Sequence, residues 1–214
     1  PLSASGCFLF LLGMRIVVLD SDTLGFDASA WEPIQSLGEL TLHGRTAYEE
    51  DLIVERAGGA EAVLTNKVPF SAETLARLPD LKYIGILATG YNIIDLPAAR
   101  ENGVTVANVP AYSTASVIQH TLALILEALN QVGRHNASVH AGDWAHSPLF
   151  AYWLEPPVEL EGKTVGFIGY GDIGSGVGEC VHALGASVLA HSPSRSTTPG
   201  WQPFAWASVE EIFE

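Results

Sequence analysis

The segment TVGFIGYGDIGSGVGECVHALGASVLAHSPSR, residues 164–195, decides how the second half of this chain folds. Its first part, at 165–168, is a short and mostly apolar run, typical of a strand buried on both faces. Three glycines follow this run directly. A helical stretch then reaches about Leu184, and a second apolar run lies at 187–190. The segment therefore predicts a strand, a turn, a helix and a strand in one unit.

The three glycines form a Gly-x-Gly-x-x-Gly pattern at the start of the predicted helix. Gly169 allows a tight turn, Gly171 lets the backbone approach a pyrophosphate, and Gly174 lets the helix pack closely on the strand. Unpaired amides and the helix dipole at this terminus attract negative charge. The pattern in this context predicts a dinucleotide-binding site rather than an ordinary glycine-rich turn. The predicted site also includes the residues between the glycines, Tyr170, Asp172 and Ile173.

The end of the second strand predicts which dinucleotide is bound. A carboxylate there would bind the ribose 2′-hydroxyl of NAD, whereas an arginine accommodates the 2′-phosphate of NADP. The segment HSPSRS at 191–196 has no carboxylate, and Ser192 and Arg195 could hold a phosphate. We therefore expect an NAD(P) site that favours NADP(H) over NAD(H). The alternative is that Arg195 is a solvated loop residue and that the site takes either cofactor.

Composition limits the other classes of partner. The chain has 214 residues, 48% of them hydrophobic, and a formal net charge of -14, so we expect a sizeable core and no nucleic-acid or membrane partner. Cys7 and Cys180 are the only cysteines, which indicates a reducing, cytoplasmic location without a disulfide. The two cysteines have no histidines at ligand spacing, so no metal site is predicted.

The rest of the chain alternates β-rich and helical runs. Met14 opens a clean strand and is the suspected natural start, which makes residues 1–13 an extension, expected to be unstructured. Such alternation predicts a parallel sheet covered by helices. The expected strands lie at 15–19, 40–42, 62–65, 83–87 and 105–107, and the expected helices at 51–57, 71–78 and 95–102.

A denser apolar pattern at 114–133 has helical spacing over about five turns. It predicts a long, mostly buried helix that joins the two halves, although a helix apolar on most sides could equally face a second subunit. The aromatic and proline-rich stretch at 140–160 shows no periodicity and is expected to form an ordered arm.

Three stretches resemble the D-isomer-specific 2-hydroxyacid dehydrogenases, most closely their glycerate dehydrogenase or hydroxypyruvate reductase branch. These stretches are residues 65–129, the motif GDWAHSP at 142–148 followed by YW, and GKTVGFIGYGDIGSGV at 162–177. The resemblance implies an α/β fold with a flavodoxin-like substrate domain at 14–112 and an incomplete Rossmann dinucleotide-binding domain at 113–214. It also implies an oxidoreductase that is a homodimer in its full-length form.

Carried over position by position, the resemblance places Thr89 and Gly90 against the substrate carboxylate through their backbone amides. Lys67 could add positive charge for a 2-oxo acid, or it could be an ordinary surface lysine. Thr114 and Val117 match positions near the nicotinamide; they could also serve helix capping and packing, and both roles can hold together.

The reaction that the resemblance implies is hydride transfer between the nicotinamide and the C2 atom of a 2-hydroxy or 2-oxo acid. This chemistry needs an arginine, a histidine and a carboxylate, which the family carries later in the cofactor domain. We therefore expect a truncated chain that is inactive alone, and we assign no catalytic residue, because the seven histidines are scattered. The alternative is a non-catalytic dinucleotide-binding or scaffold protein.

Overall fold

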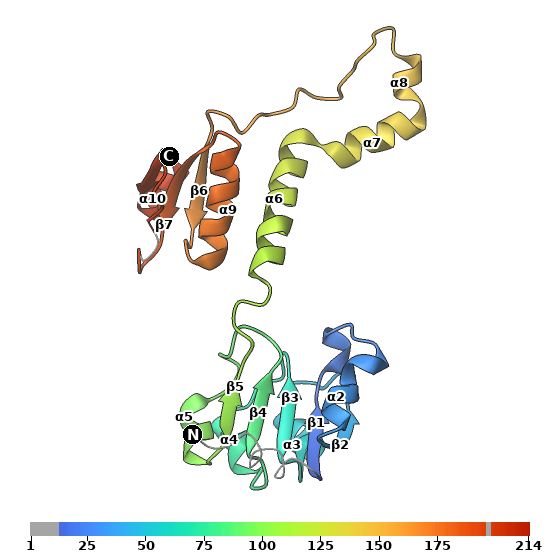
Figure 1. The fold of residues 1–214 in the computed structure, drawn as a ribbon, viewed down its shortest axis with the longest axis vertical. Helices are drawn as coiled ribbons and strands as arrows, with labels where there is room; N and C mark the ends of the chain where they lie inside the picture. Colours follow the sequence, from blue (N-terminus) through green and yellow to red (C-terminus); the bar gives the residue numbers. More distant parts are fainter. Residues whose placement is uncertain (1–12, 196–197) are drawn as a thin grey trace. The chain divides into compact units, whose positions relative to one another are not determined.

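The computed structural model describes residues 13–195 and 198–214. The chain divides into two compact units with the bounds Pro1–Tyr112 and Ser113–Glu214. Each unit is described by itself (Figure 1). Apart from Gly13, the predicted extension at 1–13 lies outside the described residues, and so does Cys7. Among the described residues, no helix combines the length and the apolar character needed to cross a membrane.

The first unit is built on one parallel sheet of five strands with the order β2-β1-β3-β4-β5. This is the flavodoxin-like order of a doubly wound sheet, so the predicted fold class is confirmed. All five predicted strands form, within two residues of their expected bounds: β1 (Met14–Val18), β2 (Gly38–Leu42), β3 (Ala62–Thr65), β4 (Tyr83–Ile86) and β5 (Thr105–Ala107).

Both faces of this sheet are buried. Successive residues of each strand point to opposite sides, and each side packs into its own hydrophobic cluster. Val17 and Leu19 pack into one core with helix residues such as Ile53, and Ile16 and Val18 pack into the other with Trp31. The elements between the strands are η1 (Ser21–Thr23), η2 (Ala28–Trp31), α2 (Glu32–Gln35), α3 (Glu50–Ala57), α4 (Ala72–Ala76) and α5 (Leu96–Glu101).

The predicted starts of two of these helices are confirmed, whereas α4 ends at Ala76, two residues before its predicted end. The Ser71 side chain accepts a hydrogen bond from the Thr74 amide at 3.1 Å, and Asp95 accepts one from the Ala98 amide at 3.0 Å. Each bond satisfies an amide that has no partner inside its helix. After α5, Gly103 has φ +70°, the left-handed conformation that favours glycine.

The second unit contains a parallel sheet with the order β6-β7-β8. The strands β6 (Thr164–Ile168) and β7 (Ser187–His191) were predicted, but β8 (Phe204–Trp206) was not, so the expectation of two strands in this domain is wrong. The short β8 forms through backbone bonds to β7: the Val188 amide donates to Pro203 at 3.1 Å, and the Ala207 amide to Ala190 at 3.0 Å.

The expectation that β6 is buried on both faces is also wrong. Val165 and Phe167 face the core of the second unit, whereas Ile168 is 61% exposed. On the opposite face, α10 (Val209–Phe213) covers Gly166, where an added Cβ would lie 2.5 Å from Ile212. The short α10 therefore shields the middle of β6 and leaves its carboxyl end open. Ser208 and Glu211 form a capping box at its start, and the hydrogen bonds from Ser208 lower the pKa of the Glu211 carboxyl.

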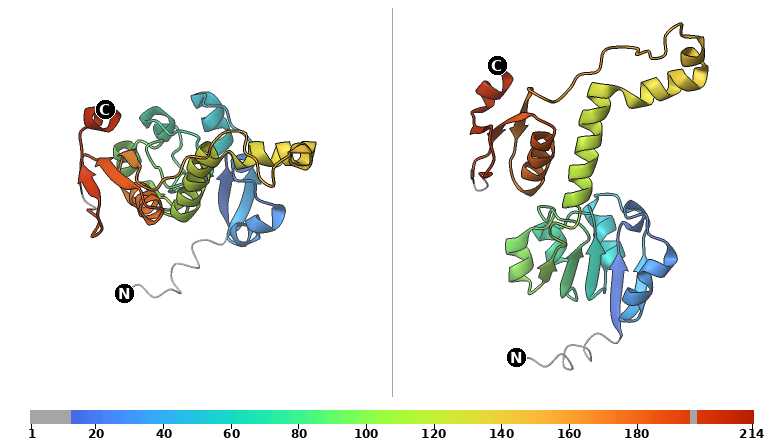
Figure 2. Two further views of the ribbon diagram at one scale, coloured as in Figure 1. Left: turned by 90° about the horizontal axis from the view of Figure 1, so that it is seen from above. Right: turned by 45° about the horizontal axis from the view of Figure 1, so that its top comes forward.

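The helix α6 (Thr114–Asn130) packs on α9 (Asp172–Ala183), as Figure 1 and Figure 2 both show. An added Cβ at Gly176 would lie 2.2 Å from Ile118, so the two helices approach closely there. The expectation of a mostly buried α6 is wrong, since no residue of this helix is fully buried. One stripe packs inward and the other side remains exposed, with Leu124 57% exposed. The helix ends before Gln131, earlier than predicted.

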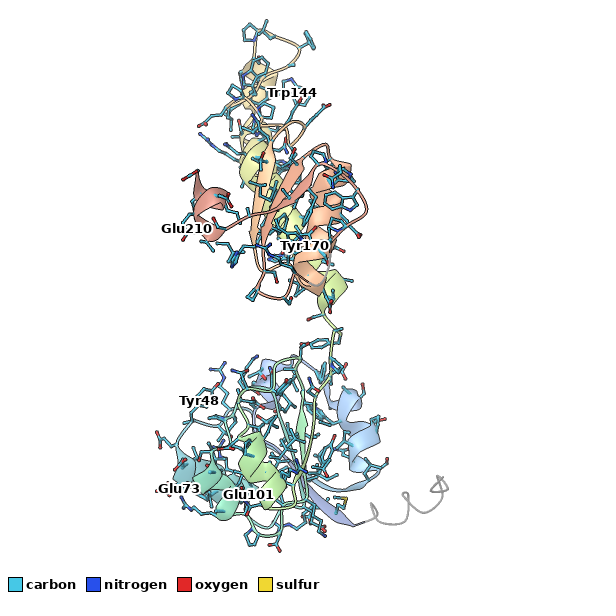
Figure 3. All side chains as sticks on the ribbon, turned by 90° about the vertical axis from the view of Figure 1, so that its left-hand side faces the viewer. Tyr48, Glu73, Glu101, Trp144, Tyr170 and Glu210 are labelled. Atoms are coloured by element: carbon cyan, nitrogen blue, oxygen red, sulfur yellow. The ribbon has the colours of Figure 1, made fainter. Side chains whose placement is uncertain are left out.

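The segment after α6 is an arm held by side chains. It contains α7 (Val132–Ala141) and α8 (Asp143–His146), two helices that the sequence analysis did not predict. The stretch that follows α8 is tied back to α7 by two hydrogen bonds: the Leu154 amide donates to His135 at 3.1 Å, and the Tyr152 hydroxyl donates to Ser138 at 3.2 Å. The Trp144 indole, labelled in Figure 3, donates to the Phe150 carbonyl at 3.1 Å.

Candidate functional site

The glycine turn between β6 and α9 has the geometry that its sequence predicts. Gly169 has φ +96°, and its amide donates to the His191 carbonyl at 2.8 Å, which ties the turn to the end of β7. An added Cβ at Gly174 would lie 2.4 Å from the Gly169 carbonyl oxygen, so the helix starts directly over the turn. At Gly171 an added Cβ would meet nothing within 4 Å. The space in front of Gly171 is therefore open to a ligand.

The N-terminus of α9 supplies donors to that open space. Gly171 is the N-cap residue, and no side chain in the described part of the chain caps this end. The first amides of a helix have no partners within it and carry the positive end of the helix dipole. This terminus is therefore suited to an anion such as a pyrophosphate. Ile173, which was predicted to belong to the cofactor site, lies in the same first turn. Asp172 places one negative charge in the same turn.

The side chain of Tyr170 lies in the core rather than in this open space. Tyr170, labelled in Figure 3, is 1% exposed. Its ring packs against those of Phe167, Phe204 and Trp206. Its hydroxyl has no hydrogen-bond partner among the described residues. Burial raises the pKa of this hydroxyl, and the charge of Glu179 adds to the effect. A contact of Tyr170 with a cofactor would therefore involve its backbone.

The predicted cofactor-selecting residues lie just beyond β7. Ser192 is buried, and its hydroxyl lies 3.5 Å from the Ser194 hydroxyl. Arg195 is exposed and has a left-handed backbone with φ +45°. Its guanidinium carbon lies 5.9 Å from the centroid of the Trp206 ring, so the side chain is held over an aromatic face.

The start of α6 lies at the same end of the second unit as the glycine turn. Ile118 and Gly176, which mark the close approach of the two helices, each lie about one turn into their helix. The first turns of both helices are therefore neighbours. Thr114 begins α6, and Val117 is partly exposed on it, which is compatible with the predicted place beside a cofactor.

The other predicted residues lie in the first unit, at the carboxyl edge of its sheet. Lys67 follows β3, and Thr89 and Gly90 follow the neighbouring β4. Ligands of open parallel sheets bind at this edge. All three residues are exposed, and Lys67 forms no ion pair among the described residues. The side chain of Asn108 after β5 donates to the Thr89 carbonyl at 2.7 Å, which fixes the loop.

A buried carboxylate that the sequence analysis missed organises this edge. Asp20 follows β1 and is only 3% exposed. One oxygen accepts the Asn66 amide at 2.8 Å, and the other accepts the Lys67 amide at 2.6 Å. Asp20 thus determines the backbone path that presents Lys67. The only signal in the sequence is an acidic residue directly after an apolar strand, which does not identify its partners.

A cavity of about 250 Å³ lies next to Asp20, with Asp22, Thr23, Arg45, Thr46 and Tyr48 also lining it. Arg45 lies 3.7 Å from the Asp22 carboxylate, and both side chains are mostly exposed. Tyr48, labelled in Figure 3, is exposed as well. None of the residues predicted to bind substrate lines this cavity.

The histidines do not form a catalytic cluster within either unit. His182 stacks on Trp201 with ring centroids 4.1 Å apart, and His135 accepts the Leu154 amide, so both act in packing or in the arm. Burial, with a contribution from Arg56, lowers the pKa of His43. Among the described residues, no three His, Cys, Asp or Glu side chains are grouped so that they could hold a metal ion.

Known proteins share this architecture. The chain is 43% identical over 200 residues to a hydroxypyruvate reductase of Blautia hydrogenotrophica, covering 93% of this chain and 62% of the relative. It is 41% identical over 138 residues to a glycerate dehydrogenase of Methylorubrum extorquens, covering 64% and 44%. A solved acyclic imino acid reductase in complex with NADPH and D-Arg superposes with a TM-score of 0.74 at 22% identity, covering 93% and 62%. This last likeness shows the fold alone.

The parallel sheets and the glycine turn define a Rossmann-like α/β protein. A model of the D-isomer specific 2-hydroxyacid dehydrogenase catalytic domain matches residues 16–212, so the chain belongs to this family. Dehydrogenases of the family use nicotinamide cofactors, and the two curated relatives are enzymes. The chain spans less than two thirds of the length of each of these relatives.

Proposed function

We propose that the second unit binds a nicotinamide dinucleotide at the start of α9 and that the protein serves hydride transfer to or from a 2-hydroxy or 2-oxo acid of the glycerate and hydroxypyruvate type. The observation that carries this proposal is the open turn at Gly171, beside an uncapped helix terminus. The names of the curated relatives support the substrate class. When bound, the nicotinamide supplies the hydride chemistry.

The chain's own residues would bind and orient the two ligands. The amides at the start of α9 would hold the pyrophosphate, while Thr114 and Val117 would lie near the nicotinamide. The amides of Thr89 and Gly90 would hold the acid's carboxylate, with Lys67 adding charge. The sheet supports this assignment because β3 and β4 pair in register at Thr65 and Ile86, so their following loops are neighbours.

A titration of the purified 214-residue chain with NADPH and NADH, followed by cofactor fluorescence, tests the proposal. We expect binding of the cofactor, and no oxidation when hydroxypyruvate or glyoxylate is then added. The reason is that no residue of this chain has been assigned to the proton transfer that the reaction needs. Turnover would overturn the expected inactivity, and a failure to bind either cofactor would overturn the cofactor site.

The second part of the proposal is that the site favours NADP(H). Arg195→Ala should weaken NADPH binding by about 1–3 kcal/mol more than NADH binding, the scale of a charge-assisted hydrogen bond. The exposed side chain of Arg195, three residues after Ser192 in the loop that follows β7, supports this expectation. Dissociation constants from the same titration measure the effect, and equal losses for both cofactors would contradict it.

We also propose a homodimer that forms through α6 and the arm. Large apolar side chains are exposed on these segments, including Leu124, Trp144 and Phe150, and exposed apolar surface is typical of a protein interface. Non-catalytic scaffolding is the second candidate function, and the same exposed side chains favour it. We also propose a cytoplasmic location, because the described Cys180 is a free thiol, as is usual in a reducing compartment.

Leu124→Lys should raise the dimer dissociation constant at least about tenfold, because an interface would lose the burial of a leucine, worth roughly 1.5–3 kcal/mol, and gain a charge. Sedimentation velocity over a range of concentrations measures the change. Leu42→Lys is the matched control, since this leucine is also exposed but lies in β2 of the first unit. A dimer unaffected by Leu124→Lys would place the interface elsewhere.

A further inference from the structure

The third strand of the second unit brings an indole to the end of β7. Ala190 and Trp206 are paired in the register of β7 and β8, and the following Ala207 amide donates to the Ala190 carbonyl at 3.0 Å. The Ala207 carbonyl also lies 3.2 Å from Nδ1 of His191. Trp206 is therefore fixed beside the loop that starts at Ser192 and contains Arg195.

Trp206 contacts both described limbs of this loop. On one limb, the guanidinium carbon of Arg195 lies 5.9 Å from the centroid of the indole ring. On the other limb, the hydroxyl of Thr198 accepts a hydrogen bond from the indole Nε1 at 3.0 Å. The backbone of Arg195 itself has φ +45°, a conformation that residues with a side chain rarely adopt.

The indole is itself held rigidly. Its ring packs edge-on against Tyr170, with centroids 5.8 Å apart, and against Phe204 at 5.2 Å. Tyr170 belongs to the glycine turn, so one aromatic cluster joins the turn, β8 and the loop after β7. An arginine resting on this cluster gives up less rotamer freedom on binding a ligand than a free arginine does.

Stacking leaves the chemistry of the guanidinium available. An arginine contacts an aromatic ring through its planar face, while its five N–H donors point outward along its edges. Those donors match the oxygens of a phosphate in a bidentate contact. The positioning matters here because Arg195 is the only Lys or Arg between Lys163 and the end of the chain.

We propose that Trp206 is a positioning residue that holds Arg195 for the 2′-phosphate of the dinucleotide, and so sets the discrimination between phosphorylated and unphosphorylated ribose. This inference rests on the proposed dinucleotide site and on its preference for NADP(H). It adds a residue from β8, which contributes to the selection without being part of the glycine turn or of the loop itself.

Isothermal titration of the 214-residue chain with adenosine 2′,5′-bisphosphate and with 5′-AMP tests the proposal without any turnover. Trp206→Leu should weaken binding of the bisphosphate about three- to tenfold, through loss of the cation–π contact and of the ordered arginine, and leave 5′-AMP binding within about twofold. Trp206→Phe keeps an aromatic face and should retain most of the discrimination. The extra affinity for the bisphosphate should fall with added salt in the wild type and less so in Trp206→Leu.

Arg195→Ala separates failure of this inference from failure of the preference on which it rests. If Arg195→Ala abolishes the discrimination and Trp206→Leu leaves it intact, Trp206 does not position the arginine. If Arg195→Ala leaves it intact as well, the preference itself is wrong. Equal weakening of both nucleotides by Trp206→Leu would indicate a purely structural role and would overturn the proposal. Melting curves monitor folding, and Trp206→Met replaces the leucine variant if that variant does not fold.

Discussion

Gly171→Val should abolish most dinucleotide binding while leaving the fold intact. The backbone at Gly171 has φ -90° and ψ -153°, which residues with a side chain adopt without strain, and an added Cβ would meet no protein atom within 4 Å. The new side chain would instead fill the space proposed for the pyrophosphate. An overpacking cost of about 1–3 kcal/mol corresponds to a loss of about fivefold to 150-fold in affinity.

Two other glycine variants make this experiment specific. Gly200→Val is the matched control, because its Cβ would also enter open space, and it should bind NADPH nearly as the wild type does. Gly174→Ala should instead lower stability, since its Cβ would lie 2.4 Å from the Gly169 carbonyl oxygen. Cofactor fluorescence and thermal melting measure the two effects. If Gly171→Val bound NADPH as the wild type does, the pyrophosphate would not bind at this turn.

The glycine turn could be predicted from the sequence because its requirements are local. Gly169 has a positive φ, and Gly174 faces the Gly169 carbonyl only five residues earlier, so both constraints act between residues that are close in the sequence. The strands of the first unit were equally accessible, because β3 is buried on both faces and therefore reads as a continuous apolar run.

The missed elements depend on contacts that are distant in the sequence. The strand β8 has three residues and forms only through its bonds with β7, so its alternating Phe204 and Trp206 are a weak signal by themselves. The exposed side of α6 was predicted to be buried for a similar reason: an apolar pattern shows that a helix needs cover, but it does not say what provides it. In both cases the error concerns which segment packs against the element, and not the tendency of the element to form.

Asp20 shows the same limit at the candidate substrate site, because its two amide partners lie 46 and 47 residues further along the chain. Resemblance to a family predicted that Thr89 and Gly90 bind substrate and that Lys67 could add charge, but it did not show what shapes the loop that carries Lys67. The parallel order of β1 and β3 brings the carboxylate and the two amides together.

Asp20→Ala should therefore destabilise the first unit by about 3 kcal/mol, because two inward-facing amides lose a charged acceptor and stay shielded from water. Asp20→Asn should lose most of the same stability, since its NH₂ group would face an amide donor. Hydrogen exchange of amides in β1, β3 and β4 measures the loss in this unit separately from the other.

Asp22→Ala is the matched control for this experiment, because it removes an exposed carboxylate from the same loop. Its ion pair with Arg45 spans 3.7 Å between mostly exposed side chains, and pairs of this kind contribute about 0–1 kcal/mol. If Asp20→Ala exchanged no faster than Asp22→Ala, the carboxylate would not hold residues 66 and 67. If it exchanged much faster, the loop that presents Lys67 would depend on a buried charge, and substrate binding should weaken together with stability.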